Sequence, residues 1–168
     1  MKIQLLSAAA ALAFFASAAL AQTAAPPAEE FVTMAASSDM FEIQSGTVAQ
    51  EKAQSAEVKE FAAMMVADHT KSSEELLAAV QESGLDITPP GAMAAKHQEQ
   101  LDALNADNVT DFDAAYIDAQ VAAHEEALAL MKSYSEGGDN EALKAHATKT
   151  LPVVQMHYEH AKQLDKTP

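Results

Sequence analysis

The sequence contains no cysteine, no tryptophan and no arginine, and aromatic residues make up only 5% of it. Without cysteine, the chain has no disulfide framework, no thiolate nucleophile and no thiol that could carry a lipid anchor. Positive charge is also scarce, because 10 lysines face 25 acidic residues and leave a net charge of −15. Phosphate backbones and anionic lipids repel such a chain, so we expect neither nucleic acid nor membrane-surface partners.

Long apolar runs are missing too, except within the first 21 residues. There Lys2 precedes an apolar run that ends in the small residues Ala19-Leu20-Ala21, which is the pattern of a secretory signal peptide (1–21) cleaved before Gln22. The alternative is a retained anchor, but the run is shorter than the roughly 20 residues that a spanning helix needs. We therefore expect a periplasmic protein with no membrane span after cleavage.

Residues 22–28 form a short proline-containing linker, and residues 29–168 are enough for one domain with one core. No alternating strand pattern competes with the helix formers that dominate this region. Apolar residues recur at steps of three and four, which predicts four long helices in an all-α fold. The predicted helices run from about Glu29 to Ala53, from Ser55 to a stop at Gly84, from near Asp111 to Gly137-Gly138, and onward from Asp139 as N-cap.

The connection between the second and third predicted helices is long. Residues 84–110 contain Pro89-Pro90 and a modest helical stretch around Met93 to Leu104. This is too long for a simple hairpin and long enough for a crossover along the bundle. Counting residues does not decide between a crossover and an up-down-up-down path. In the last helix, Pro152 predicts a kink, which either turns His157 toward the bundle axis or simply bends the helix around its neighbours.

Three histidines occupy apolar seams on three separate predicted helices. They are His69, His124 and His157, and Glu42 lies on the seam of the remaining long helix. At about 1.5 Å per residue, the first two histidines and Glu42 come out at similar heights, whereas His157 comes out about one turn away. Burying a carboxylate among imidazoles is costly unless the groups pair or share a cation. We therefore predict one transition-metal ion bound by these four residues, and the ligand set suits Zn, Fe, Cu, Ni or Mn.

Each of these residues also has a simpler interpretation. A single histidine on an apolar face is usually a core residue with one hydrogen-bond partner. Glu42 follows Asp39 at capping-box spacing, so it would instead cap a helix that restarts there. Three further residues are candidates for orienting the ligands: Asp68, Asp113 and Tyr116. The remaining histidines fall off the seams and are predicted to be solvated: His97, His146 and His160.

Three long stretches have sequences similar to those of a known family: "EEFVTMAASSDMFEIQSGTVAQEKAQSAEVKEFAAMMVADHT", "FDAAYIDAQVAAHEEAL" and "LKAHATKTLPVVQMHYEHAKQL". They resemble the bacterial domain-of-unknown-function family 4142, whose members are exported and often labelled outer membrane proteins. The resemblance implies a ferritin-like four-helix bundle with a long crossover that contains a short extra helix. It rests on Glu42, Asp68-His69, Phe112-Asp113, Tyr116, His124 and Leu151-Pro152 with His157.

One departure from ferritin-like enzymes narrows the choice of function. Their di-iron sites use several carboxylates and Glu-x-x-His motifs, whereas no histidine of this chain follows a glutamate by three residues. A redox enzyme is therefore the weakest hypothesis. The first hypothesis is a metal-binding bundle with a role in metal handling or envelope stress. The alternative is a non-catalytic interaction or protective bundle whose buried histidines are structural.

Overall fold

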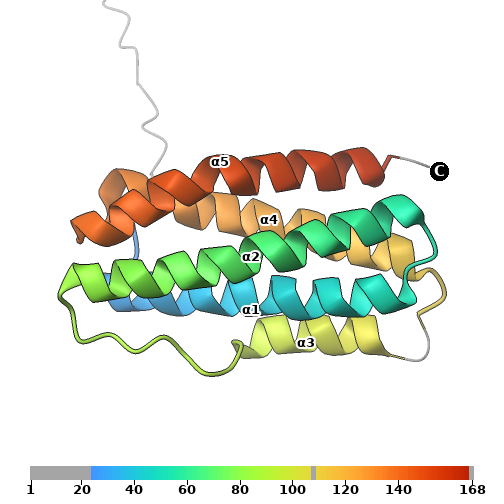
Figure 1. The fold of residues 1–168 in the computed structure, drawn as a ribbon, viewed down its shortest axis with the longest axis horizontal. Helices are drawn as coiled ribbons and strands as arrows, with labels where there is room; N and C mark the ends of the chain where they lie inside the picture. The colour runs from blue at the N-terminus through green and yellow to red at the C-terminus, as the bar shows by residue number, and fades with distance from the viewer. Residues whose placement is uncertain (1–23, 107–108, 167–168) are drawn as a thin grey trace, which may run out of the picture.

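The computed structural model describes residues 24–106 and 109–166, so the predicted signal peptide (1–21) lies outside the described residues. Within them the chain forms five helices and no strand (Figure 1). The helices are α1 (Ala28–Lys52), α2 (Ala56–Ser83), α3 (Ala95–Asn105), α4 (Phe112–Gly137) and α5 (Glu141–Leu164). The predicted all-α fold of four long helices and one short helix is confirmed. None of the five helices combines the length and the apolar character needed to cross a membrane.

The short helix α3 determines the direction of α4. In Figure 1, α3 runs back along the outside of α1, so that α4 begins at the same end of the bundle as α2 and runs parallel to it. Hydrogen bonds fix this arrangement at both ends. Asp113 at the start of α4 accepts from the backbone N–H groups of Gln54 (2.9 Å) and Ser55 (2.7 Å), just before α2. At the opposite end, Asn140 before α5 donates to the carbonyl of Ser83 in α2 (3.2 Å). The path is therefore the crossover and not up-down-up-down.

Polar side chains begin the helices much as the sequence predicts. Ser55 caps α2 by accepting from the N–H of Val58, and Gly84 ends this helix in the left-handed conformation with φ of 68°. Asp111 caps α4 by accepting from the N–H of Ala114 at 3.1 Å. These caps satisfy backbone groups that lack partners within the helix.

The predicted N-cap of the last helix is wrong by one residue. Asn140, not Asp139, caps α5, and its side-chain oxygen accepts from the N–H of Ala142 at 3.1 Å. Asp139 has other partners, because it accepts from the hydroxyl of Tyr134 at 2.8 Å and from the N–H of Ala28 at 3.4 Å. A tertiary contact that joins α4 and α1 therefore outweighs the local capping preference of the aspartate.

The core is divided into two apolar clusters with a polar layer between them. One cluster, near the α1–α2 turn, is built around Phe41, Phe61, Met65, Tyr116 and Ile117. The other, near the α4–α5 turn, is built around Phe31, Val32, Leu76, Tyr134 and Leu143. Between them along the helices lie buried polar residues, namely Asp39, Glu42, His69, Gln120, His124 and His157. The fold therefore holds these six polar side chains at mid-height, with apolar packing on both sides.

Helices α1 and α2 approach closely at Gly46. A Cβ atom at this position would lie 2.9 Å from the carbonyl oxygen of Ala62 and 2.9 Å from a methyl group of Val66. We therefore expect Gly46→Ala to destabilise the fold by about 1–3 kcal/mol through overpacking, although alanine is the better helix former by about 1 kcal/mol. Urea unfolding measures the effect. Gly91→Ala is the control, since its Cβ meets nothing within 4 Å, and a Gly46→Ala variant as stable as wild type would contradict the prediction.

Candidate metal centre

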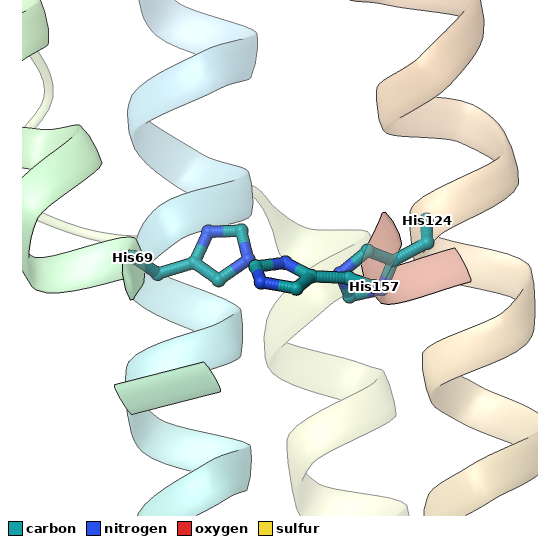
Figure 2. A group of neighbouring side chains, drawn as sticks. All are labelled: His69, His124 and His157. Carbon is teal, nitrogen blue, oxygen red and sulfur yellow. The ribbon is translucent and has the colours of Figure 1, made fainter. Parts of the chain in front are cut away.

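The three seam histidines meet at one point in the middle of the bundle. His69 from α2, His124 from α4 and His157 from α5 point toward one another (Figure 2). Their ring centroids lie 5.5–5.7 Å apart, which makes a nearly equilateral triangle. One ring nitrogen from each lies within 4.8 Å of the others, and the three residues are only 5%, 1% and 1% exposed. In the structure, His157 therefore lies level with the other two histidines, and not one helical turn away as residue counting predicts.

Each imidazole uses its outer nitrogen for a hydrogen bond to an oxygen outside this histidine cluster. The bonds are His69 Nδ1 to Asp39 Oδ1 (2.7 Å), His124 Nδ1 to the carbonyl oxygen of Gln120 (2.9 Å), and His157 Nε2 to Asp68 Oδ2 (2.9 Å). Carbonyl and carboxylate oxygens accept, so each of these nitrogens carries the hydrogen and donates. The tautomer of each neutral ring is therefore fixed by its outer partner.

The other nitrogen of each ring has no hydrogen-bond partner among residues 24–106 and 109–166. These inner nitrogens are Nε2 of His69, Nε2 of His124 and Nδ1 of His157, and all three are buried. Because the outer nitrogens hold the hydrogens, the inner nitrogens of the neutral rings carry lone pairs. Three lone pairs in a buried cluster are what a transition-metal ion needs from histidine, and the cluster can hold such an ion.

Burial and charge act differently on the three rings. Burial lowers the pKa of His124 to about 3, with a further lowering from the neighbouring charge of His69. Burial also lowers the pKa of His157. Burial acts the same way on His69, but its hydrogen bond to Asp39 and the charge of Glu42 outweigh this and raise its pKa. At neutral pH two of the three rings are therefore already in the neutral form that binds metal ions.

Glu42 lies beside the cluster and on its outer side. It is 1% exposed, and its Oε2 accepts from Nε2 of Gln120 at 2.6 Å. Its Oε1 lies 3.8 Å from Nδ1 of His124, the nitrogen that faces away from the other two rings. Helix α1 runs unbroken through Asp39 and Glu42, so the interpretation of this pair as a capping box is wrong. A ligand role for Glu42 stays a prediction.

Two of the outer partners are missing from the sequence-based site, and only Asp39 has a signal in the sequence. Asp39 lies three residues before Glu42 and so shares the inward face of its helix with a residue already singled out. The partner of His124 is the backbone carbonyl four residues earlier, which any residue at position 120 would offer, whereas the side chain of Gln120 bonds Glu42. Asp39 also accepts from the hydroxyl of Ser73 at 3.4 Å. Spacing within the helix is enough to nominate Asp39, but its partners are visible only in the folded chain.

The three predicted orienting residues have different outcomes. Asp68 does hold a histidine, but it holds His157 on α5 and not its sequence neighbour His69. Asp113 bonds the backbone before α2 and has no part in the cluster. The hydroxyl of Tyr116 is buried and has no hydrogen-bond partner within the described part of the chain.

The prediction that the other three histidines are solvated is wrong for His146, and the other two are only partly exposed. His146 is 5% exposed, and burial lowers its pKa. His97 and His160 are half-buried, the first stacked on Phe41 and the second edge-on to Phe61. An imidazole has enough flat apolar surface to pack against an aromatic ring at the edge of a seam, and this preference is not apparent in the periodicity.

Glu42 can be tested in the metal-free protein through its pKa. Burial raises this pKa from 4.5 to about 7, so between these values the folded chain binds more protons than the unfolded chain. The contribution of Glu42 to stability therefore falls as the pH rises through this range. In a chelator, we expect isosteric Glu42→Gln to gain stability relative to wild type between about pH 5 and about pH 8, as measured by urea unfolding. A difference that stays constant across this range would contradict the assignment.

Comparisons with known proteins agree with the architecture. A solved structure described as CopM in the Cu(II)-bound form has the same fold, with a TM-score of 0.71 over 84% of this chain and 97% of that chain, at 18% identity. No curated protein sequence matches the chain. The profile of the domain of unknown function DUF4142 matches residues 13–164, which include every residue of the cluster and its outer partners. The chain therefore belongs to the DUF4142 family.

Proposed function

We propose that this chain is an exported helical bundle that binds a single transition-metal ion, with Cu(II) as the first candidate, and takes part in metal handling. The ligands are the inner nitrogens of His69, His124 and His157. The observation that carries the proposal is that these three buried nitrogens converge within 4.8 Å and have no hydrogen-bond partner in the described part of the chain. The predicted signal peptide supports export to the periplasm.

A purely structural role for the histidines explains this arrangement poorly. Each buried polar atom without a partner costs about 1–3 kcal/mol, so a core that used histidine only for packing would be expected to satisfy both ring nitrogens. When all three rings are neutral, a water molecule can donate to only two of the three inner lone pairs, because it has two hydrogens. A single cation can bind all three.

The outer hydrogen bonds support the same interpretation. Histidines that bind metals usually donate their other N–H to a carboxylate or a carbonyl, which fixes the tautomer and aims the ring. Here two rings donate to aspartates and the third to a backbone carbonyl. Ligand distances of about 2.0–2.1 Å require nitrogens roughly 3.5 Å apart, so small ring rotations complete the site. Three protein ligands leave a fourth position for solvent. The predicted ligand Glu42 lies on the outer side of His124 and would reach this position only after a movement of its side chain.

The choice of copper rests on two observations. Imidazole nitrogen is a borderline ligand, and among divalent first-row ions the affinity of such a site is greatest for Cu(II). The protein of similar fold is described in a Cu(II)-bound form, although 18% identity transfers only the fold. The acidic residues near the cluster face the outer sides of the rings, so a carboxylate-rich di-iron centre is not supported.

Metal analysis tests the proposal directly. We expect the tag-free wild-type protein, reconstituted with Cu(II) and desalted, to retain about one ion per chain and to show imidazole nitrogen couplings in its EPR spectrum. Free copper at about 1,000 times its Kd would stabilise the fold by about 4 kcal/mol. His124→Ala should lose both the bound copper and the stabilisation, and so should His69→Ala and His157→Ala.

His160→Ala is the matched control, because His160 is half-buried on the same helix as His157 but lies outside the cluster. It should retain copper like the wild type. Circular dichroism without metal confirms that each variant folds. Copper retained by all three cluster variants would contradict the proposed ligands, and retention of Zn, Ni, Fe or Mn in preference to copper would contradict the choice of ion.

A further inference from the structure

The cluster is closed to solvent, which raises the question of how an ion reaches it. The three histidines are 5%, 1% and 1% exposed, so a hydrated cation cannot contact their inner nitrogens without a movement. The three outer hydrogen-bond partners differ in how exposed they are. The Asp39 side chain is 6% exposed and Gln120 is fully buried, whereas the Asp68 side chain is 37% exposed. Among the three outer bonds, the one between Asp68 and His157 is thus the link between the cluster and the surface.

A surface hollow lies on the outer side of this bond. It has a volume of about 90 Å³ and lies between α2 and α5, where its wall includes Asp68, Ser72, Thr150 and Val153. Glu75 and two lysines complete the wall, and Glu75 pairs with Lys149 at 2.9 Å and with Lys71 at 3.9 Å. Both lysines pair with Glu75, so the carboxylate of Asp68 is the other acidic group of the hollow, and it pairs with His157 instead of with a lysine.

Helix α5 is weakened at the level of this hollow. Pro152 has no N–H, so the carbonyl of Thr148 loses its normal helical partner. Thr150 and Val153, on either side of the proline, both line the hollow. A helix bends most easily where such a hydrogen bond is missing, so the α2–α5 seam is easier to open beside Asp68 than elsewhere along α5.

We propose that Asp68 is the residue through which the metal centre is loaded. Its carboxylate binds a hydrated transition-metal cation in the hollow, and the cation displaces the N–H of His157 from the carboxylate. His157 is then free to rotate and take the ion inward to the other two histidines. This inference rests on the proposed metal-binding function, and it assigns Asp68 a role in the rate of loading that a merely orienting residue does not have.

Stopped-flow kinetics separate these roles. Binding of Cu(II), supplied as a weak glycine complex, is followed by quenching of tyrosine fluorescence in the full-length tag-free chain. Asp68→Asn keeps the shape and an oxygen that accepts from His157, but it removes the charge. We expect its association rate constant to fall about tenfold or more, in the range typical of lost electrostatic attraction. Asp118→Asn removes the same charge from the exposed face of α4 and should bind at the wild-type rate.

A second variant tests the hollow itself. Val153→Phe fills the hollow from a residue that is 39% exposed, so we expect association and dissociation to slow by the same factor with Kd unchanged. Leu77→Phe, at a 48% exposed position on α2 away from the hollow, is the control and should change neither rate.

Two results would overturn the loading role while leaving metal binding intact. One is an Asp68→Asn variant with an unchanged association rate constant and faster dissociation, which is the behaviour of a residue that only orients His157. The other is a Val153→Phe variant with unchanged rates. A wild-type chain that takes up no copper at equilibrium would instead overturn the proposed function, and the loading role with it.

Discussion

The contact between Asp113 and the backbone before α2 sets the geometry on which the centre depends. By accepting from the N–H groups of Gln54 and Ser55, this carboxylate ties the start of α4 to the start of α2. Because α3 has already returned the chain to this end, the two helices then rise in parallel from a common level (Figure 1). His69 and His124 follow their helix starts by nearly the same number of residues, so they arrive at the same height. If α4 were antiparallel to α2 and began at the other end of the bundle, the height of His124 would depend on its distance from that end instead.

The polar layer across the middle of the bundle lowers the stability of the fold, and the rest of the core has to compensate for it. Its carboxylates and imidazoles lie between two apolar clusters, which shield them from water and so strengthen every charge interaction within the layer. The same shielding leaves the inner nitrogens without partners. Local interactions that oppose packing are typical of functional sites rather than of structural cores. The clusters on either side supply the hydrophobic burial that allows the layer to exist.

Much of this arrangement follows from periodicity, and the exceptions have physical causes. Steps of three and four residues are enough to predict the long helices and to place His69, His124 and His157 on inward faces, because the helix period is fixed by the backbone. The height of His157 was not predictable, since a residue count ignores the tilt between helices. The position of Glu42 on the outer side of its neighbour depends on side-chain rotamers and on Gln120. The N-cap of α5 was not predictable for a similar reason, because Asp139 bonds residues of α4 and α1 instead of capping α5.

The three imidazoles lie on α2, α4 and α5, so the last of them is on the final helix of the chain. A nascent chain that has produced only α1 to α4 owns two of the imidazoles and has no chelating triangle. With the three ligands proposed above, the complete site forms only when α5 docks, so a partly synthesised chain would lack the three-histidine site. A cation bound at this site would cross-link α2, α4 and α5, because none of these helices could then separate without breaking a coordinate bond.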